Sequence, residues 1–154
     1  MSARLRLHLL GLLLPTIAAC IFLAILGHQF DVAGLKAATI VATPAVLGAQ
    51  VAALLCWRYV DRSARNHRSA WINGVLMALL AHFLFGLFMA IELAVFAGFQ
   101  DGNSIGVLTG TLVQTLFFTF MSLMVAGALS IPLTAWATHG VARRREKELA
   151  LEIG

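Results

Sequence analysis

Charged side chains are scarce in this chain. Asp, Glu, Lys and Arg make up 12% of its 154 residues, whereas hydrophobic residues make up 60%. Soluble domains carry about 25% charged residues, so half that fraction indicates that lipid is the main solvent of the protein. Outside the apolar stretches, no segment is long enough for a soluble domain. The sequence therefore predicts a single transmembrane domain over residues 1–154.

Cysteine is also scarce, since Cys20 and Cys56 are the only two and no CxxC pair occurs. They lie in different apolar stretches, near ends that should face opposite sides of a membrane, too far apart to form a disulfide. The residues before Cys20 (Ile17-Ala18-Ala19) resemble a lipoprotein cleavage site. The apolar run continues to Leu26, however, which favours an uncleaved first membrane helix.

Four apolar blocks are present, at residues 7–26, 37–59, 71–99 and 107–137. About twenty apolar residues suffice for a helix to cross the hydrocarbon layer. We therefore expect an all-α integral membrane four-helix bundle. The last two blocks exceed that length and must tilt or bend, and Pro44 and Pro132 predict bends in the second and fourth helices. Residues 138–154 predict a cytoplasmic tail that forms a short amphipathic helix.

The basic residues are distributed unevenly around these blocks. Ten of the eleven fall in three groups, with Lys36 as the exception: Arg4 and Arg6; Arg58, Arg62, Arg65 and Arg68; Arg143, Arg144, Arg145 and Lys147. Four spans place all three groups on one side, and cytoplasmic loops retain Lys and Arg. Both termini are therefore predicted to be cytoplasmic. The short loops and the Ala, Leu and Arg content are typical of a bacterial inner membrane protein.

The basic groups predict contact with anionic lipid headgroups. The residues expected to make it are Arg58, Arg62, Arg65, Arg68, Arg143, Arg144 and Arg145. Nucleic acid is a poor alternative, because no stacking aromatics are interleaved with the basic residues. Asp61 and Arg65 are four residues apart and should pair if this stretch is helical.

Small residues recur at every fourth position of the third block. The row is Gly74, Ala78, His82, Gly86, Ala90, Ala94 and Gly98, with His82 as its one large member. Small residues at this spacing allow another helix backbone to approach closely. The row packs either inside its own bundle, which is the commoner use, or against another membrane protein or a second copy of this chain.

His82 and Glu92 are the ionisable residues of the third block. An acid inside a membrane span is costly, and Glu92 is the only one in any block, so it is a candidate site by default. With Thr111, Thr115 and Gln114 of the fourth block, these two residues form a candidate proton or ion site. The simpler interpretation is interhelical hydrogen bonding. Haem ligation by His82 is disfavoured because no second axial ligand is evident, and no metal or cofactor is expected.

Three functions are compatible with these features. The first is a non-catalytic accessory or structural subunit of a larger inner-membrane complex. The second is a small oligomeric transporter or channel with Glu92 as a proton-sensitive group and His82, ten residues away, as a further candidate. An enzyme acting on lipid is the weakest, because no catalytic set of residues supports it. The sequence favours the first.

Overall fold

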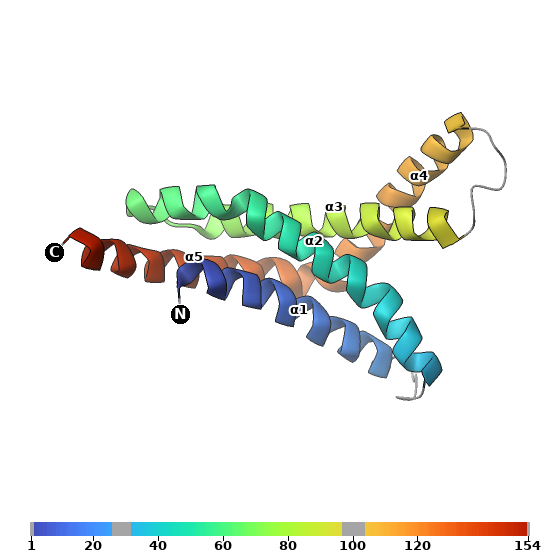
Figure 1. Ribbon diagram of the computed structural model, residues 1–154, viewed down its shortest axis with the longest axis horizontal. Coiled ribbons are helices and arrows are strands. Elements are labelled where there is room, and N and C mark those ends of the chain that lie inside the picture. Colours follow the sequence, from blue (N-terminus) through green and yellow to red (C-terminus); the bar gives the residue numbers. More distant parts are fainter. Residues whose placement is uncertain (1, 26–31, 97–103, 154) are drawn as a thin grey trace.

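The chain folds into long helices packed side by side (Figure 1). The structure is a computed structural model, and it describes residues 2–25, 32–96 and 104–153. Its elements are α1 (Ala3–Ile25), α2 (Val32–Arg65), α3 (Trp71–Phe96), α4 (Ser104–Ser122), the π-helical segment η1 (Leu123–Gly127) and α5 (Ala128–Ile153). No strand occurs in these ranges. The predicted all-α class is confirmed.

Within the described residues, three helical segments are long and apolar enough to cross a membrane: Thr39–Arg65, Trp71–Phe96 and Gly106–Glu152. Helix α1 has 23 residues and contains Pro15. Of the two predicted outer loops, 27–36 and 100–106, residues 27–31 and 100–103 lie outside the described residues, as does Gly98 of the small-residue row. Residues 32–36 and 104–106 are helical and begin α2 and α4, so both loops were predicted too long.

Helix α2 continues past residue 59, the predicted end of the second block, so that Arg62 and Arg65 are also helical. The expected pair of Asp61 and Arg65 is present at 2.8 Å and supports this last turn. The helix then ends in a Schellman motif. His67 adopts a left-handed φ of 50°, and the amide of Arg68 donates to the carbonyl of Ser63 at 2.9 Å. This turn leads directly into α3.

The sequence predicted that the C-terminal tail forms a separate short helix, and this prediction is wrong. Helix α5 runs without a break from Ala128 to Ile153, so the tail is its continuation. It lies against this chain's own helices, because Arg145 contacts Asp61 of α2 and Glu148 accepts a hydrogen bond from the amide of Ala3 in α1. These contacts keep the tail aligned with the bundle.

The long fourth segment bends where α4 meets α5 (Figure 1). Segment η1 lies at this junction, and π turns are a usual cause of helix kinks. The sequence predicted the bend at Pro132, which lies inside α5. The two features are adjacent, because the proline ring crowds the carbonyl of Ala128, the residue that follows η1. Pro44 likewise lies inside α2, which curves along its length (Figure 1).

Helix α3 is central: it contacts α2, α4 and α5, whereas α1 packs on α2 and α5. The buried cluster at the end opposite α4 consists mainly of small residues: Ala3, Leu7, Ala52, Ala53, Cys56, Val60, Ala70, Met77, Val141 and Ala142. Gly48 shows how close the backbones come, since an added Cβ would lie 3.0 Å from the carbonyl oxygen of Ala81. Close backbone contact is the usual way for helices to associate in lipid.

Candidate functional site

The small-residue row of α3 faces helices of the same chain. Five of its members are buried (Gly74, Ala78, His82, Gly86 and Ala90), and Ala94 is half-buried. A Cβ added at Gly74 would lie 2.5 Å from the Cα of Ala135, and one added at Gly86 would lie 2.6 Å from the carbonyl oxygen of Thr115. The row therefore packs against α4 and α5, and this part of α3 is not open to a second protein.

His82 joins the two ends of the π segment. One ring nitrogen, Nδ1, lies 2.6 Å from the hydroxyl of Ser122, and the other, Nε2, lies 2.7 Å from the hydroxyl of Ser130. A neutral imidazole donates from one nitrogen and accepts at the other, and a serine hydroxyl can take either role. Both ring nitrogens of this buried histidine thus have a partner.

The π segment explains why two serines eight residues apart reach the same ring. On a regular α-helix, eight residues turn the chain about 80° away from the starting face. One extra residue held in a π turn makes the interval equivalent to seven, which reduces the offset to about 20°. Ser122 and Ser130 stand on either side of Leu123–Gly127 and so face α3 together. The sequence does not reveal Ser130 as a partner, because its spacing is wrong for a regular helix.

The other members of the predicted proton or ion site are not joined to His82 by hydrogen bonds. The hydroxyl of Thr111 donates to the carbonyl of Val107 at 2.9 Å, and that of Thr115 to the carbonyl of Thr111 at 2.7 Å. Both threonines thus bond within their own helix. Gln114 is exposed and Glu92 is half-buried. Neither forms a hydrogen bond or ion pair with another residue that the structure describes.

A second polar contact links α1 to α2. The Nδ1 atom of His8 lies 2.9 Å from Oε1 of Gln50, and Nε2 of Gln50 donates to the carbonyl of His8 at 2.8 Å. Gly11 leaves room for this side chain, since an added Cβ would lie 3.4 Å from Nε2 of Gln50. The sequence did not predict this pair, because His8 lies only one turn from the charged N-terminus.

Asp61 neutralises part of the basic end of the bundle. It accepts hydrogen bonds from Arg65 and from Arg145, each at 2.8 Å. Arg145 also contacts Glu148 at 3.5 Å and Glu152 at 3.1 Å. Arg143 and Arg144 pair with Glu146 and Glu148, respectively. Four of the seven arginines expected to contact lipid therefore have carboxylate partners inside the protein.

Three arginines remain without such a partner. Arg58, Arg62 and Arg68 are exposed and form no ion pair with any carboxylate in the described part of the chain. They line two adjoining hollows at the end of α2, which we call together the arginine hollow. The first, of about 540 Å³, is lined by Arg62, Ser63, Asn66 and Arg68. The second, of about 690 Å³, is lined by Arg58, Tyr59, Asp61, Arg62, Arg65 and Asn66.

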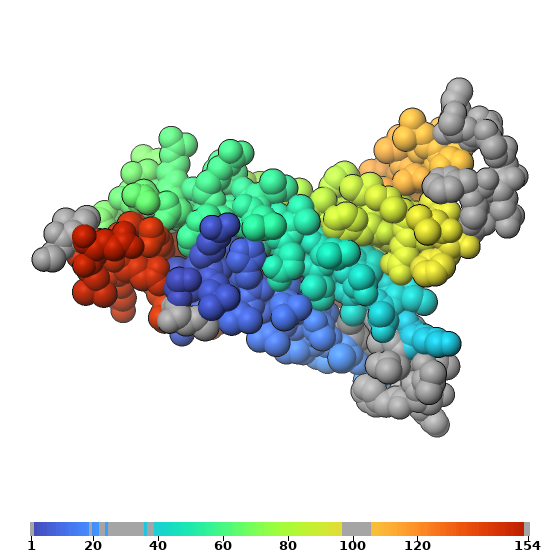
Figure 2. All heavy atoms as spheres, in the orientation of Figure 1, coloured from blue at the N-terminus to red at the C-terminus, as the bar shows by residue number. Residues whose placement is uncertain are grey.

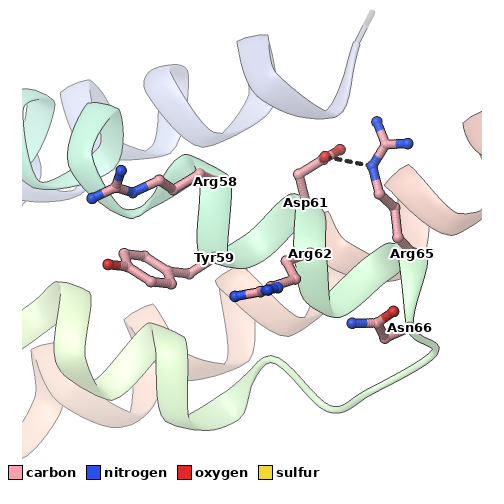
Figure 3. A pocket seen from close by; sticks show the side chains of 6 residues that line it. All are labelled: Arg58, Tyr59, Asp61, Arg62, Arg65 and Asn66. Atoms are coloured by element: carbon pink, nitrogen blue, oxygen red, sulfur yellow. Dashed lines mark hydrogen bonds and ion pairs between the residues drawn. The ribbon is translucent and has the colours of Figure 1, made fainter.

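The side chains that line the arginine hollow point in two directions (Figure 3). Arg58, Tyr59 and Arg62 extend in the same direction from α2, whereas Asp61 and Arg65 turn toward each other. The guanidinium carbon of Arg58 lies 5.2 Å from the centre of the Tyr59 ring, within the range of a cation–π contact. The hollow thus combines unneutralised guanidinium groups with neutral donors.

Comparison with protein-family models, with curated proteins and with solved structures finds no match.

Proposed function

We propose that this protein is a non-catalytic subunit of a larger assembly in the bacterial inner membrane, with four membrane-spanning helices and both termini in the cytoplasm. The three long apolar helices, the 23-residue α1 and the grouping of the arginines support this topology. The observation that carries the subunit role is the surface of α4.

Helix α4 leaves most of its apolar surface uncovered. Among its residues with described burial, 106–122, only Thr115 is buried. Six large apolar side chains are each more than half exposed: Leu108, Leu112, Val113, Leu116, Phe117 and Phe120. Of the apolar stretch within Gly106–Glu152, 6% is buried, against 44% for that of Trp71–Phe96. Figure 2 shows α4, in orange, projecting at one end of the molecule, where it lies against α3.

The arrangement of the polar groups favours a structural role over a catalytic one. His82 and Gln50 bond to other helices, and Thr111 and Thr115 bond to their own helix. Polar side chains in membrane helices commonly serve this purpose. Neither half of the arginine hollow is lined by His82 or Glu92.

Photo-crosslinking in intact membranes tests the subunit role. A benzophenone side chain replaces Phe117 on α4 or, as the matched control, Leu54, which is 52% exposed on α2. We expect a protein adduct at Phe117, heavier than the 16.5 kDa chain, and lipid adducts at Leu54. Lipid adducts alone at both positions, together with a bare monomer after mild extraction, contradict the proposal.

A proton-coupled transporter is the second candidate, and the environment of Glu92 favours it. This half-buried acid lies in an apolar helix and forms no ion pair with other described residues. In liposomes, Glu92→Gln then abolishes proton-coupled flux, whereas Glu146→Gln in the tail leaves it unchanged. Absence of flux in the unaltered protein, or equal flux in all three, removes this candidate.

A further inference from the structure

The arginine hollow concentrates positive charge that the protein itself does not neutralise. Among the described residues, Asp61 is the only acid that lines it, and both of its carboxylate oxygens are bonded to arginines, one to Arg65 and one to Arg145. Arg58, Arg62 and Arg68 also line the hollow, and none of them pairs with a carboxylate of the described residues. Like charges held together cost free energy, so a site of this kind is stabilised by an anion.

Local structure fixes the donors of the hollow. The Schellman motif at the end of α2 turns the chain back, so that Arg68 lines the same hollow as Arg62 and Ser63. His67 holds the left-handed φ that this turn requires. Asn73 of α3 donates to the hydroxyl of Ser63 at 2.8 Å and to the carbonyl of Tyr59 at 3.1 Å. The hydroxyl of Ser63 therefore keeps its own hydrogen for another acceptor.

We propose that the arginine hollow is a binding site for a phosphate group. Guanidinium groups present paired N–H donors that match two phosphate oxygens, and such charge-assisted bonds are the strong ones. Ser63 and Asn66 supply neutral donors for the remaining oxygen.

The phosphate group has two possible sources, a lipid headgroup or a soluble phosphate. The hollow lies at the end of an apolar helix, where Trp57 and Tyr59 are typical of the headgroup layer. The same donors would also accept a phosphate from solution. The proposal does not depend on the subunit role, because it rests only on the residues of the hollow.

Titration calorimetry on the full chain in a non-ionic detergent distinguishes the sources. The probes are inorganic phosphate, dioctanoyl phosphatidic acid and, as a zwitterionic control, dioctanoyl phosphatidylcholine. The pocket variant is Arg62→Gln with Arg68→Gln. The matched control is Arg4→Gln with Arg6→Gln, which removes the same charge outside the hollow at two arginines that are also exposed and unpaired in the described part. Because Arg62 and Arg68 are exposed and unpaired in the described part, unchanged helical circular dichroism is expected for both.

We expect one saturable site per chain, with affinity at least about tenfold lower in the pocket variant and changed by less than about twofold in the control. A further variant, Arg62→Lys with Arg68→Lys, keeps the charge but loses the paired N–H donors of the guanidinium group. Its affinity should lie between those of the pocket variant and the control. Saturation by phosphatidic acid alone identifies a headgroup, and saturation by inorganic phosphate as well identifies a soluble ligand. No saturation by either probe, or equal losses in the pocket and control variants, overturns the proposal.

Discussion

At the scale of single residues, the interior relies on polar side chains that join different helices. His82 bonds to Ser122 and Ser130, and Gln50 bonds to both a side-chain and a main-chain atom of His8. Interhelical hydrogen bonds in membrane proteins contribute about 0.6 kcal/mol each on average. Because its ring forms two such bonds, His82 helps to hold α4 and α5 against α3 and stabilises the fold.

Replacement of His82 tests this contribution. His82→Ala removes both bonds, leaves the hydroxyls of Ser122 and Ser130 without this partner, and opens a cavity. We expect the free energy of unfolding to fall by about 2–4 kcal/mol, as measured by steric trapping in bicelles. Thr111→Val, which removes a bond within one helix, should cost less than about 1 kcal/mol. Equal falls in unfolding free energy for the two variants would show that the bonds of His82 between helices stabilise the fold no more than a bond within one helix.

Thr138, unlike His82, is a fully buried polar residue whose side chain has no hydrogen-bond partner among the described residues. An unpaired buried hydroxyl costs about 1–3 kcal/mol. Thr138→Val keeps the shape and removes the unpaired group, so the unfolding free energy should rise by about 1 kcal/mol. Thr115→Val, at a buried threonine whose hydroxyl is bonded, should give no such gain. A loss at Thr138 would mean that the hydroxyl has a partner after all.

At the scale of elements, the contact of α3 with α4 depends on a missing side chain. A Cβ at Gly86 would press on the side chain of Thr119 and lie 2.6 Å from the carbonyl oxygen of Thr115. Because backbone atoms cannot give way locally, the two helices must separate. Gly86→Ala should therefore lower the unfolding free energy by about 1–3 kcal/mol. Gly110→Ala is the matched control, since nothing lies within 4 Å of its added Cβ, and it should be neutral or slightly stabilising.

The π segment is the second feature at this scale. A straight helix from Leu108 to Leu151 would span about 65 Å at 1.5 Å per residue. The bend between α4 and α5 should make the distance between spin labels at these positions clearly shorter (Figure 1). Deletion of Val125 removes the extra residue and restores a regular helical repeat, so Ser130 follows Ser122 by seven residues and still faces His82. We expect the label distance to lengthen. A distance that is already near 65 Å, or that the deletion leaves unchanged, contradicts this role of η1.

Much of the element level could be predicted from sequence, because it follows from local patterns. Apolar blocks predicted long helices, and the four-residue row on α3 predicted a face for close packing. The spacing of Asp61 and Arg65 predicted their pair. Ser130 could not be predicted as a partner of His82, because a π turn changes the face of every residue after it and has no distinctive composition. Arg145 and Asp61 are 84 positions apart in the sequence, and no local pattern predicts a contact over that distance.

At the scale of the whole molecule, most of the charged residues in the described part gather at one end of the bundle. The C-terminal part of α5, the end of α2 and the start of α1 meet through Asp61, Arg145, Glu148 and the amide of Ala3. Lys36, in the first turns of α2, lies at the other end of that helix from Asp61. This separation of charge is the physical basis of the proposed orientation, since basic groups resist transfer across the membrane.

The central claim is that the helices cross a bilayer an even number of times, and cysteine accessibility in spheroplasts tests it most directly. Single cysteines replace Ser2, Lys36 or Lys147 in a chain carrying Cys20→Ala and Cys56→Ala. An impermeant maleimide should label the Lys36→Cys variant in intact cells, and the other two only after the membrane is permeabilised. Labelling of Ser2→Cys and Lys147→Cys from opposite sides would contradict the account.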